Sequence, residues 1–213
     1  MKAGNVIFDL DGTLWDTSAT VAESWTQTLQ SFNIPMYSKR VFTADDMKGV
    51  MGLTMTDIAE KLFPDLSPTR QMEMIDRCSE DENNYLAEHG ALIFDGVEEM
   101  LAKLSSDKRL FIVSNCQCGY IETFLEYSGF EKYFSDYLCW GDTRKEKAET
   151  IRQLIEDNKC INSVYVGDTR SDYTAAVKAE IPFVHAAYGF GTLKNSDTPL
   201  AVVNSPIELC SVL

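Results

Sequence analysis

The chain has 213 residues, of which 45% are apolar, so it can bury a sizeable core as one large domain or as a core with an inserted lobe. Its formal net charge of -14 argues against binding to DNA, RNA or anionic lipid, because like charges repel. A substrate that carries a phosphate group would therefore need a local cation.

The first predicted element is a buried strand at residues 5–11, "NVIFDLD", an apolar run without amphipathic periodicity. About a hundred residues separate it from the next such run, far more than a crossover between parallel strands requires. Within this interval apolar side chains recur at helical spacing, and Ser67 and Pro68 form a helix start. We therefore expect a small helical lobe from about residue 17 to 90, with Trp25 in the core of the lobe.

The later apolar runs predict four more buried strands, at residues 109–115, 136–140, 163–169 and 182–189. A helix at residues 96–106 leads into the first of them, and helical stretches lie between the others. Strands that alternate with helices predict a parallel sheet with right-handed crossovers. The sequence thus indicates an α/β protein in which residues 1–16 and 91–213 form the core and residues 17–90 the lobe.

Polar side chains stand at the ends of several predicted strands. In an open parallel sheet, ligands bind beyond the carboxyl ends of the strands, so these residues are candidates for a site. They are Asp9 and Asp11, Ser114 and Asn115, Asp168, and Asp172 four residues later.

Asp9 and Asp11 lie two residues apart, so in extended geometry their side chains point the same way. Two carboxylates that close repel each other, and a hard cation such as Mg²⁺, held by oxygen atoms of Asp9 and Asp168, would resolve this. The metal would keep Asp9 ionised as a nucleophile, while Asp11 could hold the proton that a leaving group needs. Gly12 permits a sharp turn after the strand, and Thr13 can donate a local hydrogen bond.

Four short motifs make the chain resemble the haloacid dehalogenase superfamily of phosphohydrolases. They are "DLDGT" at 9–13, "IVSN" at 112–115, a lysine within "KEKAETI" at 145–151, and "GDTRSD" at 167–172. They occur in the order of that family, so the resemblance covers essentially the whole chain. It implies a Rossmann-like parallel-sheet core with an inserted α-helical cap domain, the cap being the lobe at 17–90.

The resemblance also implies roles for single residues. Asp9 would take the phosphoryl group as an aspartyl phosphate, and Asp11 would protonate the leaving alcohol and then activate water. Ser114 would bind the phosphoryl oxygens, and a lysine would neutralise the negative charge. Either Lys145 or Lys147 fits, and Lys147 fits better because a small residue follows it at a helix start.

The metal ligands implied by the resemblance are Asp9, Asp168 and the main-chain carbonyl of Asp11, with Asp172 acting through a metal-bound water or by holding the lysine. Mg²⁺ would be the cofactor. Members of the family with true dehalogenase activity lack the second acid of the first motif, so Asp11 favours phosphoryl chemistry here.

Substrate selection would come from the cap, because the core recognises only a phosphate group. Residues 47–57, "MKGVMGLTMTD", could form a loop that closes over the site, although an ordinary connection between helices is the alternative reading. We expect the substrate to contact Asn115, Thr13, Lys48 and Gly52.

Three functions are compatible with these patterns. The first is a Mg²⁺-dependent phosphatase of small phosphomonoesters, resembling the phosphoglycolate phosphatase branch of the family. The second is a phosphosugar mutase of the β-phosphoglucomutase type, and the third a phosphoacceptor module of the response-regulator receiver type. The partner would be a small phosphorylated metabolite, with no nucleic acid and no membrane. The six cysteines are scattered and no secretion signal is visible, so we expect reduced thiols and a cytoplasmic protein, of an oligomeric state that the sequence does not indicate.

Overall fold

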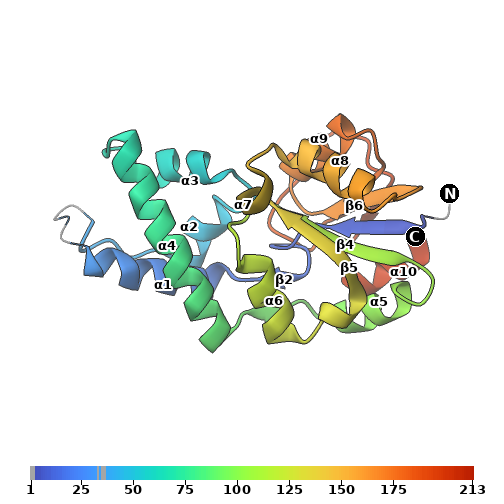
Figure 1. Cartoon of the computed structure of the whole chain (residues 1–213), viewed down its shortest axis with the longest axis horizontal. Coiled ribbons are helices and arrows are strands. Elements are labelled where there is room, and N and C mark those ends of the chain that lie inside the picture. The colour runs from blue at the N-terminus through green and yellow to red at the C-terminus, as the bar shows by residue number, and fades with distance from the viewer. Residues whose placement is uncertain (1–2, 33, 35–36) are drawn as a thin grey trace.

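The computed structural model describes residues 3–32, 34 and 37–213, and it contains a parallel sheet between two layers of helices with a helical part on one side (Figure 1). The α/β fold expected from the sequence is confirmed. The domain ranges 1–16, 17–90 and 91–213 remain a prediction. They include residues 1, 2, 33, 35 and 36, which lie outside the described residues.

Within the described residues the main sheet has six parallel strands in the order β5-β4-β1-β6-β7-β8. They are β1 (Asn5–Phe8), β4 (Arg109–Ser114), β5 (Phe134–Cys139), β6 (Ser163–Gly167), β7 (Phe183–Ala186) and β8 (Ala201–Val203). The sequence indicated the first five. It did not indicate β8, because three residues are too short to show a pattern. β1 pairs with both β4 and β6, so the residues that follow these three strands meet at one edge.

Helices cover both faces of the sheet (Figure 1). One face is covered by α8 (Lys147–Asp157) and α9 (Arg170–Lys178), and the other by α5 (Val97–Leu104), α6 (Tyr120–Ser128) and α10 (Leu209–Val212). In β1, Val6 and Phe8 pack into one core cluster and Ile7 into the other. Because the strand is buried on both faces, the residues after Asn5 form a continuous apolar run. Three shorter helical turns are η1 (Glu131–Tyr133), α7 (Trp140–Thr143) and η2 (Pro206–Glu208).

The chain leaves the sheet domain and returns to it through a short antiparallel ribbon. Its strands are β2 (Trp15–Asp16) and β3 (Leu92–Ile93), with Trp15 opposite Ile93. Between them lie α1 (Ser18–Ser31), α2 (Ala44–Lys48), α3 (Met55–Leu62) and α4 (Pro68–His89). Strands of two residues carry no periodicity, so the sequence did not indicate this ribbon.

The helical lobe formed by α1 to α4 has an aromatic core. Phe63 is fully buried, and its ring lies 6.5 Å from that of Trp25 and 5.4 Å from that of Tyr37. Thr43 and Thr54 cap α2 and α3 by accepting hydrogen bonds from the backbone N–H groups three residues on. Across the described part of the chain, no helix is both long and apolar enough to span a membrane.

Candidate active site

The turn after β1 is held against the end of β6. Asp9 is buried, and its N–H donates to the carbonyl of Val166 at 2.8 Å. Gly12 has φ of +79°, and a Cβ at this position would lie 2.4 Å from a carboxylate oxygen of Asp168. Gly189 packs against the same turn, since a Cβ at position 189 would lie 2.2 Å from the carbonyl oxygen of Gly12. Both glycines are thus needed for the backbone to approach the aspartates.

Lys147, at the start of α8, connects two of the aspartates. Its Nζ lies 2.9 Å from Oδ1 of Asp9 and 2.6 Å from Oδ1 of Asp172, and its side chain is 3% exposed. Burial opposes the charged form, but Asp172 and Asp9 outweigh it and raise the pKa of Lys147 well above its ordinary value. Lys145 instead donates to Oε1 of Gln153 at the surface, at 2.9 Å. Of the two lysines, Lys147 is the one that reaches the aspartates.

Asp172 is fixed by the helix it helps to cap. Its Oδ2 accepts hydrogen bonds from the backbone N–H of Thr169 at 2.9 Å and from the Thr169 hydroxyl at 2.6 Å. The Thr169 hydroxyl in turn accepts from the N–H of Asp172, which completes a capping box at the start of α9. This arrangement leaves Oδ1 of Asp172 for Lys147.

Asp168, directly after β6, has one oxygen that is satisfied and one that is not. Its Oδ2 accepts from the N–H groups of Phe190 at 2.7 Å and Gly191 at 3.2 Å. Its Oδ1 is buried and finds no hydrogen-bond partner among the described residues. Oxygens of Asp9, Asp168 and Asp172 lie within 4.8 Å of one another. A buried acceptor without a donor is costly, and a cation would satisfy it.

The pKa values reflect this crowding of carboxylates. Burial, and after it repulsion from Asp172, raises the pKa of Asp9 to about 7 and that of Asp168 to about 8. A divalent cation with oxygen ligands would favour the ionised forms of both groups. A group of three buried carboxylates, of which Asp168 has an unpartnered oxygen, therefore fits a hard ion such as Mg²⁺.

Asp11 makes a different set of contacts. Its Oδ1 accepts hydrogen bonds from the hydroxyl of Thr17 and the hydroxyl of Tyr120, both at 2.8 Å. Burial raises the pKa of Asp11 to about 6, which makes the protonated form accessible near neutrality. Its side chain is not part of the three-carboxylate group found among the described residues. The arrangement thus separates a cluster suited to a metal from a carboxyl suited to proton transfer.

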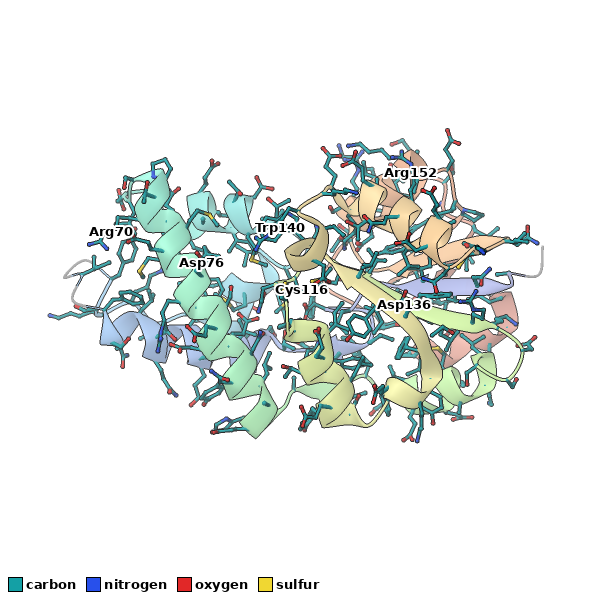
Figure 2. All side chains as sticks on the ribbon, in the orientation of Figure 1. Arg70, Asp76, Cys116, Asp136, Trp140 and Arg152 are labelled. Carbon is teal, nitrogen blue, oxygen red and sulfur yellow. The ribbon has the colours of Figure 1, made fainter. Side chains whose placement is uncertain are left out.

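A cavity of about 60 Å³ lies where the sheet meets the helical lobe. Asp9 and Asp11 line it, and so do Ser114 at the end of β4 and Asn115 and Cys116 directly after it. Figure 2 labels Cys116, which lies between the two parts of the molecule. The helical lobe closes the cavity with Gly52 and mostly apolar side chains.

The structure brings some of the expected substrate contacts together and leaves others apart. Asn115 donates from Nδ2 to the carbonyl of Gly52 at 3.1 Å, which joins the core to the loop between α2 and α3, and both residues line the cavity. Thr13 is buried outside the lining, and its hydroxyl has no partner in the described part of the chain. Lys48 also lies outside the lining, with its Nζ 3.5 Å from Oδ2 of Asp16 and 5.5 Å from the centre of the Phe190 ring.

The cavity lining includes residues that were not expected from the sequence, among them four that carry nitrogen or oxygen in their side chains, namely Trp25, Glu82, Gln117 and Tyr120. Trp25 packs in the lobe core as expected, but its Nε1 also donates to Oε2 of Glu82. Glu82 stands in the acidic run "SEDENN" at 79–84, where nothing marks one acid as buried. The sequence therefore held no signal that would have selected it.

Comparison with known proteins gives concordant matches. The family model described as "Haloacid dehalogenase-like hydrolase" matches residues 6–186. The pyrophosphatase PpaX of Listeria innocua is 30% identical over 187 residues, which is 84% of this chain and 81% of that protein. A phosphoglycolate phosphatase of Photobacterium profundum is 26% identical over 216 residues, covering 96% of this chain and 90% of the relative.

A solved structure supports the same fold. A hydrolase of the haloacid dehalogenase-like family from Streptococcus pneumoniae superposes with a TM-score of 0.82 at 21% identity, covering 98% of this chain and 97% of that one. At this identity the likeness is evidence for the fold alone.

Proposed function

Because this chain belongs to the haloacid dehalogenase-like hydrolase family and is a phosphatase of that family, we propose that it hydrolyses a small phosphomonoester with Mg²⁺ through an aspartyl phosphate on Asp9. Membership confirms the resemblance seen in the four motifs and the prediction of an enzyme. The observation that carries the proposal is the buried contact of Lys147 with Asp9 and Asp172, beside the unpartnered oxygen of Asp168.

In the first step a carboxylate oxygen of Asp9 attacks the phosphorus, and the bond from phosphorus to the alcohol oxygen breaks. Asp11 donates its proton to the leaving oxygen, so the alcohol departs neutral. Mg²⁺, held by Asp9 and Asp168 with the main-chain carbonyl of Asp11, would offset the charge of the transferring group, while Asp172 holds Lys147. Lys147 orients Asp9 and adds a fixed positive charge, and Ser114 at the cavity wall donates to a phosphoryl oxygen.

In the second step water attacks the phosphorus and Asp11, now ionised, takes the proton of that water. The bond between phosphorus and Asp9 breaks, inorganic phosphate leaves, and both aspartates return to their starting states. The pKa of about 6 for Asp11 supports this double role, because both protonation states are within reach near neutral pH.

The other candidate functions have less support. A phosphosugar mutase would use the same residues for transfer to a sugar hydroxyl, and analysis of the products separates it from a phosphatase. The family match over residues 6–186 argues against a receiver-type module. The names of the relatives suggest pyrophosphate and phosphoglycolate as first substrates to test.

The test is phosphate release from a small aryl phosphate, with Mg²⁺ and with excess chelator. We expect activity that depends on Mg²⁺ and falls by several orders of magnitude in Asp9→Asn, with the fold retained. Asp157→Asn, a matched change at an exposed position at the end of α8, should retain the wild-type rate. A wild-type rate in Asp9→Asn would end the proposal.

A further inference from the structure

The cavity wall contributed by the helical lobe is apolar except at one position. Val50, Met51, Leu53 and Ile58 are typical of this wall. Among the described residues of the lobe, Glu82 is the only charged side chain that lines the cavity. It faces a space that also contains Asp9, the proposed nucleophile. A carboxyl group in an apolar wall calls for an explanation, because a hydrocarbon side chain at the same position would be buried at a lower cost in free energy.

Glu82 is held rigidly as an acceptor. Its Oε2 accepts a hydrogen bond from Nε1 of Trp25, and its Oε1 accepts from Nε2 of Gln117 at 3.3 Å. Gln117 is fixed in turn, since the same Nε2 also donates to Oδ1 of Asn83 at 2.9 Å. Each carboxylate oxygen can accept about two hydrogen bonds, so one acceptor site per oxygen is left over. Glu82 is 6% exposed, which leaves the cavity as the place where a further donor can reach its carboxylate.

The charges around the cavity are distributed unevenly. Its charged lining residues are Asp9, Asp11 and Glu82, and no lysine, arginine or histidine of the described chain lines it. Lys147 and a metal would compensate the aspartate side, where the phosphoryl group binds. Glu82 has no such compensating cation among the described residues that line the cavity, and its hydrogen-bond partners Trp25 and Gln117 are neutral. The part of the cavity that receives the leaving group is therefore negative and rich in acceptors.

We propose that Glu82 selects the leaving group, so that the preferred substrate is the phosphate ester of a small alcohol whose far end carries a hydrogen-bond donor, an ammonium or a hydroxyl group. This inference rests on the proposed phosphatase function and narrows it. A leaving group that ends in a carboxylate, as in phosphoglycolate, would meet Glu82 with like charge and without a donor. The small cavity, of about 60 Å³, favours a short chain.

The test compares four esters of similar size: aminoethyl, hydroxyethyl, propyl and carboxymethyl phosphate, the last being phosphoglycolate. The measured quantity is kcat/KM for each ester with Mg²⁺, in wild type and in Glu82→Gln. The assay is run at pH about 8.5, because burial raises the pKa of Glu82 to about 7 and the carboxyl must be ionised. Glutamine keeps the shape and an oxygen for Trp25, but it removes the charge and adds a donor. Glu80→Gln, the same change at an exposed position on α4, is the control.

In wild type we expect the two donor-bearing esters to react faster than propyl phosphate, and carboxymethyl phosphate to react most slowly. In Glu82→Gln the ratio of kcat/KM for aminoethyl over carboxymethyl phosphate should fall at least tenfold, the scale of one charged hydrogen bond. Glu80→Gln should leave the ratio unchanged.

Two results would overturn the inference while the phosphatase function stands. One is a wild type that hydrolyses aryl phosphate but prefers carboxymethyl phosphate. The other is a Glu82→Gln variant in which all four rates change by the same factor, which would mean that Glu82 merely fastens α4 to the loop of Gln117. Failure of wild type to hydrolyse even the aryl phosphate would refute the proposed function itself, and this inference with it.

Discussion

The replacement Lys147→Met tests whether the lysine neutralises the aspartate cluster. Methionine has a similar length but no charge, so the change leaves Asp9 and Asp172 without their shared cation. At about 3 Å and an effective dielectric constant of about 20, each contact is attractive by about 6 kcal/mol, although burying the three ions offsets most of this. Removal of one partner from such a buried group typically costs about 3–5 kcal/mol. We expect the free energy of unfolding, measured in the absence of metal, to fall by this amount.

The loss should depend on pH and on the metal. Without the lysine the pKa of Asp9 rises above its present value of about 7, so at lower pH the carboxyl is neutral and the penalty shrinks. Mg²⁺ should restore stability more in the variant than in wild type, because the cluster of the variant carries one more net negative charge. Turnover should still fall roughly a hundredfold or more, since Mg²⁺ cannot replace the oriented charge of the lysine.

The assay is urea unfolding in chelator and in Mg²⁺, at two pH values on either side of the pKa of Asp9. Lys145→Met is the control, because Lys145 contacts Gln153 at the surface, and its loss should cost little. A cost below about 1 kcal/mol for Lys147→Met in chelator, or one that neither acid nor Mg²⁺ reduces, would refute the reasoning.

Three further changes test separate parts of the site. Asp168→Asn keeps an oxygen for the two backbone N–H donors but loses the unpartnered carboxylate oxygen. The Mg²⁺ concentration for half-maximal activity should therefore rise at least tenfold. An unchanged Mg²⁺ titration would contradict the assignment of Asp168 as a metal ligand. Burial raises the pKa of Glu82 from 4.5 to about 7, so its ionised form destabilises the fold by about 3 kcal/mol above that pH. Glu82→Gln should therefore raise the unfolding free energy at pH about 8 and not below pH 4.5, where the glutamate is protonated in both states; urea curves with equal gains at both would disprove this. Lys48→Ala should change kcat/KM little on every substrate, because the ammonium lies beside Asp16 outside the cavity; a tenfold loss confined to the best substrate would instead assign it to substrate binding.

The sequence predicted the sheet and the aspartate cluster well for a physical reason. Parallel strands bring their carboxyl ends to one edge, so Asp9 and Asp168 had to be neighbours once β1 and β6 were placed side by side. The sequence alone did not settle the choice between Lys145 and Lys147, because Lys145 precedes α8 and Lys147 opens it. The structure was needed to show which of the two side chains points toward the aspartates. Lys147 is the first residue of α8 and is buried, whereas Lys145 lies two residues before the helix and is exposed.

The leaving-group side of the cavity could not be predicted in this way. Glu82 and Trp25 are 57 residues apart, and Glu82 and Gln117 are 35 apart. Their contacts depend on how α1 packs on α4 and how the lobe meets the loop after β4. Local pattern carries no information on such packing. The same limit applies to β8, whose three residues are recognisable as a strand only because they pair with β7.

The most direct test of the central claim is to locate the phosphoryl group on the enzyme. Wild type is mixed with excess substrate and Mg²⁺, quenched in acid, reduced with borohydride, and digested for peptide mass spectrometry. Borohydride reduces an acyl phosphate of aspartate to homoserine, so the account predicts homoserine at position 9, absent without substrate or without Mg²⁺. Homoserine at position 11 or at another aspartate, or none at position 9 in an enzyme that is turning over, would contradict it.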